Sequence, residues 1–541
     1  FETLINSDII NIDNYLTDTN WTFTEDNSNK QESLVYGRDA KWLINSWRSQ
    51  FTITTFVKLF HTLLKPLKNN VLRTHRIAHS ILILDEIQCI PIKYWDIIKK
   101  ILLACTRVLN VNVFLSTATQ PALMEGVKDV KLIKLAENHL QANPINYSGK
   151  SSRKDKKRAD LKQTIDKNLD RYTIYYYPKA LKLCNKEESR EEEEKDEDAN
   201  FLKKLLYFLN SEEFHDKNIL IVVNTKGAAL KIYNYLNENL IQKEGTDIES
   251  KLRVLSTWVL PLHRRVIIRE IKDHLDKNSK DNSNVKTNYI VISTQVIEAG
   301  VDLSFEIVIR DLAPLDSVVQ VAGRCNRSME YGKKKGKMFL VELKDESNSA
   351  YFHYIYQKTR GAYDYTKKFL MSLQGKQSGR NGLIDKQNKD LKSLNYFGNF
   401  IAISEPKLRK KFSEYFRKIK IPNNTDMLLD KFSSLNYEVL ADKFKMIKNY
   451  ENEQIVFIPI NNEARTIHQD ISENNKAIPN KFYLYTLKIS DKIVKKLLSE
   501  NVIQPIYEKR KNGKSSILYY YFLPEQYEQY YSKNTGFIHT Y

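Results

Sequence analysis

Short apolar segments that end abruptly in polar residues recur along the chain and organise its pattern. Residues 289–292 (YIVI) are followed by Ser293-Thr294-Gln295, and residues 307–309 (IVI) are followed by Arg310-Asp311. Short, continuous runs of this kind, rich in β-branched residues, predict buried parallel strands. Because ligands of open α/β sheets bind at the carboxyl ends of such strands, we expect chemistry at the polar residues that follow each run.

The same pattern occurs earlier in the chain, with chemically different endings. Residues 81–84 (ILIL) end in Asp85-Glu86, and residues 111–115 end in a segment that contains Thr117 and Thr119. An acidic pair at the end of a buried strand suits Mg²⁺ held through water and an attacking water polarised beside it. Asp85 is the candidate for the metal, Glu86 for the water, and the two threonines for linking the site to domain movement.

A helix is predicted after the strand at 307–309, with Asp316 as its N-cap. Its buried side is formed by Val318, Val319, Val321 and Ala322. Gln320, Arg324 and Arg327 fall at i, i+4 and i+7, which places them on one helical face. The planar guanidinium binds two phosphate oxygens at once, so this face is a candidate arginine finger for a nucleoside triphosphate. A solvent-facing helix with incidental arginines is an equally good interpretation of this pattern alone.

Composition and charge narrow the class of partner. The 541 residues suffice for three or four domains, and the net charge of +19 favours a polyanionic partner. Residues 187–198 hold nine acids and two bases, and we expect this run to be solvated. The four cysteines have no paired metal-ligand spacing and suit a reducing, cytoplasmic location. No apolar run reaches transmembrane length.

Four segments in this order resemble motifs II, III, V and VI of superfamily 2 helicases. They are D-E-I-Q at 85–88, T-A-T-Q-P at 117–121, S-T-Q-V-I-E-A-G-V-D at 293–302 and Q-V-A-G-R-C-N-R at 320–327. Three longer phrases resemble the CRISPR-associated helicase–nuclease of type I systems more closely. These phrases are L-S-T-A-T-Q-P-A-L, I-E-A-G-V-D and D-L-A-P-L-D-S-V-V-Q-V-A-G-R-C-N-R. The resemblance covers residues 45–345, with gaps.

The resemblance implies an α/β fold of two tandem RecA-like lobes, the first incomplete at its N-terminal side, followed by an α+β accessory domain. We expect the rest of the first lobe at 1–140, a charged linker at 141–200, the second lobe at 201–345 and the accessory domain at 346–541. In the last domain, the runs at 503–507 and 517–522 flank Asn512-Gly513 and predict a hairpin.

The resemblance also implies a function and its residues. The expected activity is ATP- and Mg²⁺-dependent translocation along single-stranded DNA, with a guide-RNA surveillance complex and an HD nuclease domain as partners. The residues expected to bind nucleotide and metal or to act in catalysis are Asp85, Glu86, Thr117, Thr119, Gly300, Asp302, Gln320, Arg324 and Arg327. The residues expected to contact the nucleic-acid backbone are Thr54, Thr55, Asn224, Thr225, Ser256, Thr257 and Thr294.

Two parts of the family pattern are not found in these 541 residues. No G-x-x-x-x-G-K-[ST] phosphate loop precedes D-E-I-Q, and the dipeptide His215-Asp216 has no histidine cluster around it. The simplest account is that residue 1 lies downstream of the nuclease domain and the phosphate loop. We therefore expect this chain alone not to hydrolyse ATP. The alternatives are another superfamily 2 helicase, acting on DNA or RNA, and a non-catalytic nucleic-acid-binding subunit whose motor site has decayed.

Overall fold

The computed structural model divides the chain into two compact units, which we describe separately. Unit 1 comprises residues 1–150, 412–451 and 477–483, and unit 2 comprises residues 151–411, 452–476 and 484–541. The structure describes residues 6–7, 10–13, 20–23, 33–36, 42–65, 68–87, 90, 94–116, 133–135, 170–184, 200–211, 213–214, 217–244, 252–278, 288–298, 300–331, 336–356, 360–373, 400–408, 434, 444, 453–474, 476, 478–509 and 515–538.

A parallel sheet of three strands in unit 1 contains the strand that ends in the acidic pair. Its order is β6 (Ile81–Asp85), β7 (Asn112–Ser116) and β8 (Ile133–Leu135). Helix α4 (Trp95–Val108) packs against β7. Its buried residues include Ile97, Ile98, Ile101 and Leu102. The side chains of Ile81 and Ile83 are 63% and 66% exposed. The parallel strands predicted at 81–84 and 111–115 are confirmed, but the burial expected for the first is wrong at Ile81 and Ile83.

Two smaller sheets complete the strands described in unit 1. A parallel pair joins β2 (Ile10–Asp13) to β5 (Phe51–Thr54), and helices α2 (Phe56–Leu64) and α3 (Lys68–Ile77) follow β5. The other sheet holds β1 (Asn6–Ser7), β3 (Asn20–Phe23) and β4 (Ser33–Tyr36). Thr55 caps α2, because its side chain accepts a hydrogen bond from the Lys58 backbone amide.

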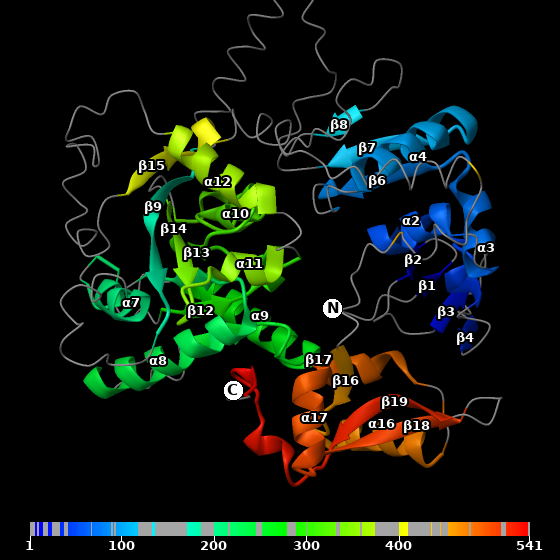
Figure 1. Ribbon diagram of the computed structural model, residues 1–541. Helices are drawn as coiled ribbons and strands as arrows, with labels where there is room; N and C mark the ends of the chain where they lie inside the picture. The colour runs from blue at the N-terminus through cyan, green and yellow to red at the C-terminus, as the bar shows by residue number, and fades with distance from the viewer. Residues whose placement is uncertain are drawn as a thin grey trace, which may run out of the picture. The chain divides into compact units, whose positions relative to one another are not determined.

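Unit 2 is built on a sheet of seven strands, which we call the second lobe together with its helices (Figure 1). In spatial order the strands are β11 (Leu252–Leu255), β12 (Ile290–Ser293), β10 (Ile219–Val222), β13 (Ile307–Asp311), β14 (Gly336–Lys344), β9 (Tyr172–Lys182) and β15 (Ile401–Ser404). All neighbours run parallel except β15, which pairs antiparallel with β9 at the edge. The expected charged linker, residues 141–200, thus contains a strand of this sheet.

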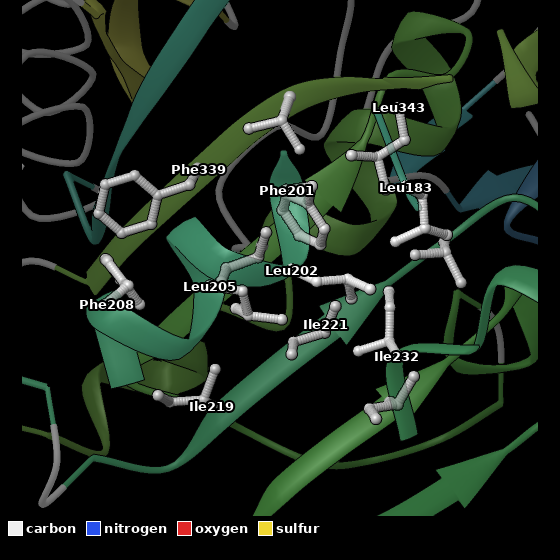
Figure 2. Close-up of a cluster of buried hydrophobic side chains, with 14 of the residues drawn as sticks. Leu183, Phe201, Leu202, Leu205, Phe208, Ile219, Ile221, Ile232, Phe339 and Leu343 are labelled. Carbon is white, nitrogen blue, oxygen red and sulfur yellow. The ribbon is translucent and has the colours of Figure 1, made fainter. Parts of the chain in front are cut away.

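Helices cover both faces of this sheet, as a parallel sheet requires. On one face, α7 (Phe201–Leu209) and α8 (Lys226–Glu244) contribute to a large apolar core. Figure 2 shows side chains of α7 gathered with residues of the strands, Ile219, Ile221, Phe339 and Leu343 among them. On the other face lie α10 (Leu315–Ala322), α11 (Tyr351–Tyr356) and α12 (Arg360–Ser372) (Figure 1). Helix α9 (Pro261–Asn278) packs beside β11.

A four-stranded sheet near the C-terminus also belongs to unit 2. Its order is β17 (Thr486–Ser490), β16 (Glu453–Phe457), β19 (Ser515–Phe522) and β18 (Ile503–Lys509), with helices α16 (Asn462–Ser472) and α17 (Asp491–Ser499). The predicted pairing of the strands at 503–507 and 517–522 is confirmed. After η11 (Tyr527–Gln529), a short hairpin of β20 (Tyr531–Ser532) and β21 (Gly536–Phe537) follows. Within the described residues, no helix is both long and apolar enough to cross a membrane.

The core under α7 gives a direct test of packing. Phe208 is fully buried, and its ring stacks on Phe214 with 4.0 Å between the centroids. We expect Phe208→Ala to lower the free energy of unfolding by about 3–5 kcal/mol, because the cavity remains after the ring is lost. Tyr207→Ala, at an exposed position of the same helix, is the control and is expected to change it by about 0.5 kcal/mol or less. Chemical denaturation of both variants measures the difference, and equal losses would contradict this packing.

Candidate functional site

Three neighbouring strands of the second lobe end together in polar residues. Strand β12 lies between β11 and β10, and Ser293 at its end pairs with both Leu255 and Val222. The residues that follow these three ends are Ser256 and Thr257, Thr294, and Asn224 and Thr225. The structure therefore brings together all five of the second-lobe residues expected to contact nucleic acid. We call this line of residues the strand edge.

The strand edge is held by hydrogen bonds between its own segments. The hydroxyl of Ser293 donates to the Leu255 carbonyl at 2.9 Å, and the amide of Thr294 donates to the same carbonyl at 3.1 Å. The hydroxyl of Ser256 accepts from the Trp258 amide at 3.1 Å. Ser256 and Thr294 are buried, whereas Thr257 between Ser256 and Trp258 is exposed. Thr257 therefore offers the most accessible hydroxyl of this group.

Asn224 and Thr225 lie where β10 leads into α8. Asn224 is 1% exposed and its amide nitrogen donates to the Leu312 carbonyl at 2.8 Å. Thr225 caps the helix, since its hydroxyl accepts from the Ala228 amide at 3.2 Å. A Cβ atom added at Gly227 would meet nothing within 4 Å, so space is open above this helix end. Helix N-termini of this kind favour phosphate, because their amides lack partners within the helix.

A guanidinium buried beneath the strand edge connects three segments. The side chain of Arg310 on β13 is fully buried. It donates to the Asn224 side-chain oxygen at 2.8 Å, to Glu298 Oε1 at 3.1 Å and to the Ser317 hydroxyl at 2.9 Å. The Ser317 hydroxyl in turn donates to the same Glu298 oxygen at 2.7 Å. The loop after β12, helix α10 and Asn224 thus share one ionic cluster, which we call the Arg310 cluster.

The two acids nearest Arg310 have shifted protonation equilibria. Burial raises the pKa of Glu298, although Arg310 and Ser317 stabilise its charged form. Burial raises the pKa of Asp311 to about 7, against the opposing effect of Arg310. One oxygen of Asp311 accepts from the Leu343 amide at 3.0 Å, and the other is buried with no partner atom. Both carboxyls are therefore harder to ionise than an ordinary side-chain carboxyl.

The segment after α10 differs from the prediction of one continuous helix. The helix begins after Pro314, so Asp316 lies in its first turn and is not the N-cap, and it ends at Ala322 with Gly323 as its C-cap. Asn326 adopts a left-handed conformation with φ of 47°. The segment pairs with Phe305, whose amide donates to the Arg324 carbonyl at 2.9 Å. Arg324 and Arg327 therefore follow the helix, and the expected single helical face with Gln320 is wrong.

Arg324 holds the loop that follows β12. It is 8% exposed, and its guanidinium donates to the Ile297 carbonyl at 3.2 Å and to the Glu298 carbonyl at 3.0 Å. Both contacts are to main-chain oxygens, which are acceptors that side-chain substitution does not remove. In this structure Arg324 therefore connects the Q-x-x-G-R-x-x-R segment to the segment that contains Glu298.

Arg327 is the more accessible of the two arginines. Its side chain is 37% exposed and lies 3.1 Å from Asp302 Oδ1, and Lys272 approaches the other oxygen of the same carboxylate at 3.7 Å. Asp302 is itself 65% exposed, so water screens this trio strongly. Gly300, two residues earlier, has a φ of 76° and open space around its Cα. Gln320 lies partly buried on α10.

The acidic pair of unit 1 stands at the end of β6, as expected. Asp85 is the last residue of the strand and pairs with Ser116 of β7, and both Asp85 and Glu86 are exposed. Glu86 has a positive φ of 53°, a conformation that costs energy in a residue with a side chain. Thr117 and Thr119 lie outside the described residues, so their expected roles stay predictions.

Thr55 caps α2, and Thr54 bonds to Asp13, whose buried carboxylate the sequence pattern did not single out. The hydroxyl of Thr54 donates to the Asp13 carbonyl at 3.1 Å. The buried carboxylate of Asp13 accepts from the Trp47 indole at 2.7 Å and pairs with Lys58. Asp13 and Arg310 were both missed because Trp47, Lys58 and Asn224, which are among their partners, are distant in sequence. The one local indication was a charged residue within or beside a short apolar run.

Among the described residues, no group of three or more His, Cys, Asp or Glu side chains could hold a metal ion. His215-Asp216 lies outside those residues. A water-mediated metal contact through Asp85 does not need such a group, so the prediction for Asp85 is unaffected.

Removing the buried guanidinium should be costly. We expect Arg310→Met to lower the free energy of unfolding by about 3–5 kcal/mol, because the buried Asn224 oxygen loses its donor and Glu298 loses its positive partner. Adding Glu298→Gln to that variant should recover part of the loss. Lys231→Met removes the exposed pair with Glu346 and is expected to cost about 1 kcal/mol or less. Urea unfolding curves of the four proteins measure this, and a small loss for Arg310→Met would contradict the cluster.

Asp311 should make stability fall with rising pH. Its pKa is higher in the folded chain, at about 7, than the roughly 3.9 of an unfolded aspartate. The folded state therefore binds the proton more tightly, and this stabilisation is complete below about pH 4 and lost as the pH rises through 7. We expect the thermal unfolding midpoint of Asp311→Asn to depend less on pH, between pH 4.5 and 7.5, than that of the wild type. Asp364→Asn, at an exposed position of α12, is the control and should keep the wild-type slope; an unchanged slope in Asp311→Asn would refute the assignment.

Residues 215–330 match the family model described as CRISPR-associated nuclease/helicase Cas3, C-terminal. A curated CRISPR-associated nuclease/helicase Cas3 from Haloferax volcanii is 28% identical over 377 residues, covering 62% of this chain and 39% of that protein. Another, from Methanothermobacter thermautotrophicus, is 28% identical over 134 residues, covering 25% and 14%. The chain thus spans about two fifths of the length of the first of these relatives.

Solved structures share the fold at low sequence identity. The crystal structure of T. fusca Cas3-ATP has a TM-score of 0.51 and 15% identity, and the match covers 84% of this chain and 52% of that one. The crystal structure of T. fusca Cas3 has a TM-score of 0.51 and 13% identity over the same shares. The α/β class with tandem RecA-like lobes is confirmed. The matching family model, the curated relatives and the shared fold make this chain similar to the CRISPR-associated helicases of the Cas3 type.

Proposed function

We propose that this chain is the helicase portion of a type I CRISPR helicase–nuclease and moves along single-stranded DNA at the expense of ATP. The observation that carries the proposal is the strand edge. Three adjacent parallel strands end in Ser256-Thr257, Thr294 and Asn224-Thr225, in the position where open α/β sheets bind ligands.

The strand edge suits a sugar-phosphate backbone better than bases. It offers hydroxyls, main-chain amides and the N-terminus of α8, and these groups contact phosphate without reading sequence. The exposed Thr257 and the open space at Gly227 provide access. The net charge of +19 favours the same polyanion. These features support sequence-independent tracking of one strand.

We assign the nucleotide contacts of this lobe to Arg327. Its guanidinium is accessible and its present partner, Asp302, is an exposed carboxylate that water screens. A triphosphate carries more negative charge than one carboxylate and would compete with Asp302 for the N–H donors of the Arg327 guanidinium. Arg324, engaged with two carbonyls, would hold the loop during that exchange. Crystallisation of T. fusca Cas3 with ATP supports a nucleotide as the ligand.

Asp85 and Glu86 fit a magnesium nucleotide. Their carboxylates are exposed at a strand end, where a hydrated metal has room for its waters. The metal would neutralise phosphate charge, and Glu86 would orient the attacking water. The strained backbone at Glu86 gives its carboxylate a direction that an extended strand would not.

The Arg310 cluster would transmit movement between the two kinds of contact. Glu298 lies four residues before Asp302, and the Arg310 guanidinium links it to Asn224 at the strand edge. A shift of the loop after β12 therefore reaches the nucleic-acid side through two short hydrogen bonds. The guide-RNA surveillance complex and an HD nuclease domain complete the proposal as partners, on the strength of the family.

We expect the 541-residue chain to bind single-stranded oligo(dT) but not to hydrolyse ATP, because its sequence holds no recognisable phosphate loop. Fluorescence anisotropy measures binding, and phosphate release measures turnover, with Asp85→Ala as the background. Thr257→Glu should weaken binding about fivefold to tenfold by placing a charge against the phosphates. Ser499→Glu adds the same charge at an exposed position on α17 and should leave affinity within about twofold.

The outcomes separate the alternatives. A chain that binds no oligonucleotide would refute the proposal. DNA-stimulated turnover that Asp85→Ala abolishes would support a motor and refute the expected inactivity, since another segment must then contact the phosphates. Oligo(U) bound more tightly than oligo(dT) would favour an RNA helicase.

A further inference from the structure

The loop between β11 and α9, residues 256–260, is covered by the C-terminal hairpin, residues 531–537. The hairpin lies more than 270 residues later in the sequence, yet main-chain bonds join it to this loop and to β11. The Phe537 amide donates to the Trp258 carbonyl at 2.9 Å, and the Val254 amide donates to the Asn534 carbonyl at 3.3 Å. This loop carries Ser256 and Thr257 of the strand edge. The hairpin therefore contacts the loop that carries this part of the candidate nucleic-acid site.

Gly536 allows the hairpin to approach this closely. Its φ is 81°, a value that side chains disfavour, and a Cβ atom there would lie 2.3 Å from the Trp258 carbonyl oxygen. The nearest atoms also include the Trp258 carbonyl carbon at 2.5 Å and the Val259 nitrogen at 2.7 Å. All three belong to the backbone of the loop, so no side-chain rotation relieves the clash. Only glycine fits the observed contact.

Tyr531 supplies the polar contact between the hairpin and the loop. Its hydroxyl oxygen accepts from the Leu260 amide at 3.0 Å and lies 2.8 Å from His263 Nδ1. Since that oxygen already accepts the amide hydrogen, its own hydrogen is available to donate to Nδ1. Without the hydroxyl, the buried Leu260 amide would have no hydrogen-bond partner, which is a substantial penalty.

Apolar packing fixes the direction of the loop. Trp258 and Leu260 are buried in a cluster with Phe537, Tyr531 and residues of the four-stranded sheet. The ammonium of Lys226 lies over the ring of Trp258, 5.1 Å from the ring centroid, and 3.8 Å from Glu453 on β16. Because Ser256 and Trp258 both point inward, Thr257 between them is left facing solvent.

We propose that the C-terminal hairpin positions Thr257 for contact with the nucleic-acid backbone, with Tyr531 and Gly536 as positioning residues. This inference rests on the proposed function of the strand edge. It adds that the strand edge needs the C-terminal hairpin in order to bind the nucleic-acid backbone. The hairpin gives the loop two defined bonds, from Phe537 and Tyr531, and an apolar anchor, and it adds one contact each to Val254 and His263 on either side of the loop. The C-terminal strands would thus act in nucleic-acid binding through Thr257, without touching the ligand themselves.

Two adjacent tyrosines allow a matched test. Tyr531→Phe removes one oxygen that contacts the loop, and Tyr530→Phe removes one oxygen that contacts Glu500 at the end of α17. We expect Tyr531→Phe to weaken oligo(dT) binding about threefold to tenfold, from the unpaired Leu260 amide. Tyr530→Phe should bind within about twofold of wild type, as an exposed bond contributes little. Gly536→Ala is the stronger variant and should weaken binding further.

A second readout reports the loop without nucleic acid. The chain has five tryptophans, and 5-fluorotryptophan labelling gives each of them a ¹⁹F signal. The signal that disappears in Trp258→Phe is that of Trp258. We expect this ¹⁹F signal to shift in Tyr531→Phe and to stay unchanged in Tyr530→Phe. A wild-type chain that binds no oligonucleotide would overturn the proposed function and this inference together. A wild-type chain that binds, beside a Tyr531→Phe variant that binds as tightly as Tyr530→Phe, overturns the inference alone.

Discussion

The second lobe depends on one positive charge buried where a strand ends. Arg310 is fully buried, and its two terminal nitrogens bond to Asn224, Glu298 and Ser317 in place of water. A buried guanidinium in this position favours only conformations of the lobe in which all three of these residues contact Arg310. The strand end, the loop after β12 and the start of α10 are consequently held in one relation, which apolar packing alone would fix less strictly.

The strand edge is supported from two sides by different kinds of interaction. On one side the Arg310 cluster holds Asn224 through charge and hydrogen bonds. On the other, the C-terminal hairpin holds the loop at 256–260 through main-chain bonds and an apolar anchor. The residues between these supports, Thr257 and Thr225, are those with some exposure. Rigid support beneath accessible hydroxyls is an arrangement that suits binding of a flexible polymer, because little order is lost on the protein side.

Local pattern was enough to predict the strands and the chemistry at their ends. The runs before Asp85, Thr294 and Arg310 all became parallel strands, as continuous apolar runs predict, although Ile81 and Ile83 of the first are exposed. Local pattern failed to predict features that depend on residues distant in the sequence. The helix before Arg324 stops early because Gly323 and the left-handed Asn326 turn the chain toward Phe305. Nothing near Arg310 or Tyr531 in the sequence indicates their partners, and the contact that requires Gly536 involves a residue more than 270 positions earlier.

Strand β9 has a consequence for how this lobe is made. It is a tyrosine-rich strand whose two sheet neighbours, β14 and β15, both follow it in the sequence, the nearer by about 150 residues. At about 5–20 residues per second, a ribosome needs about 8–30 s to deliver β14 after β9 has been synthesised. During that interval both hydrogen-bonding edges of β9 lack their final partners. The strands of the second lobe therefore cannot pair in the order of their synthesis. Strand β9 is the first to be made and among the last to be paired.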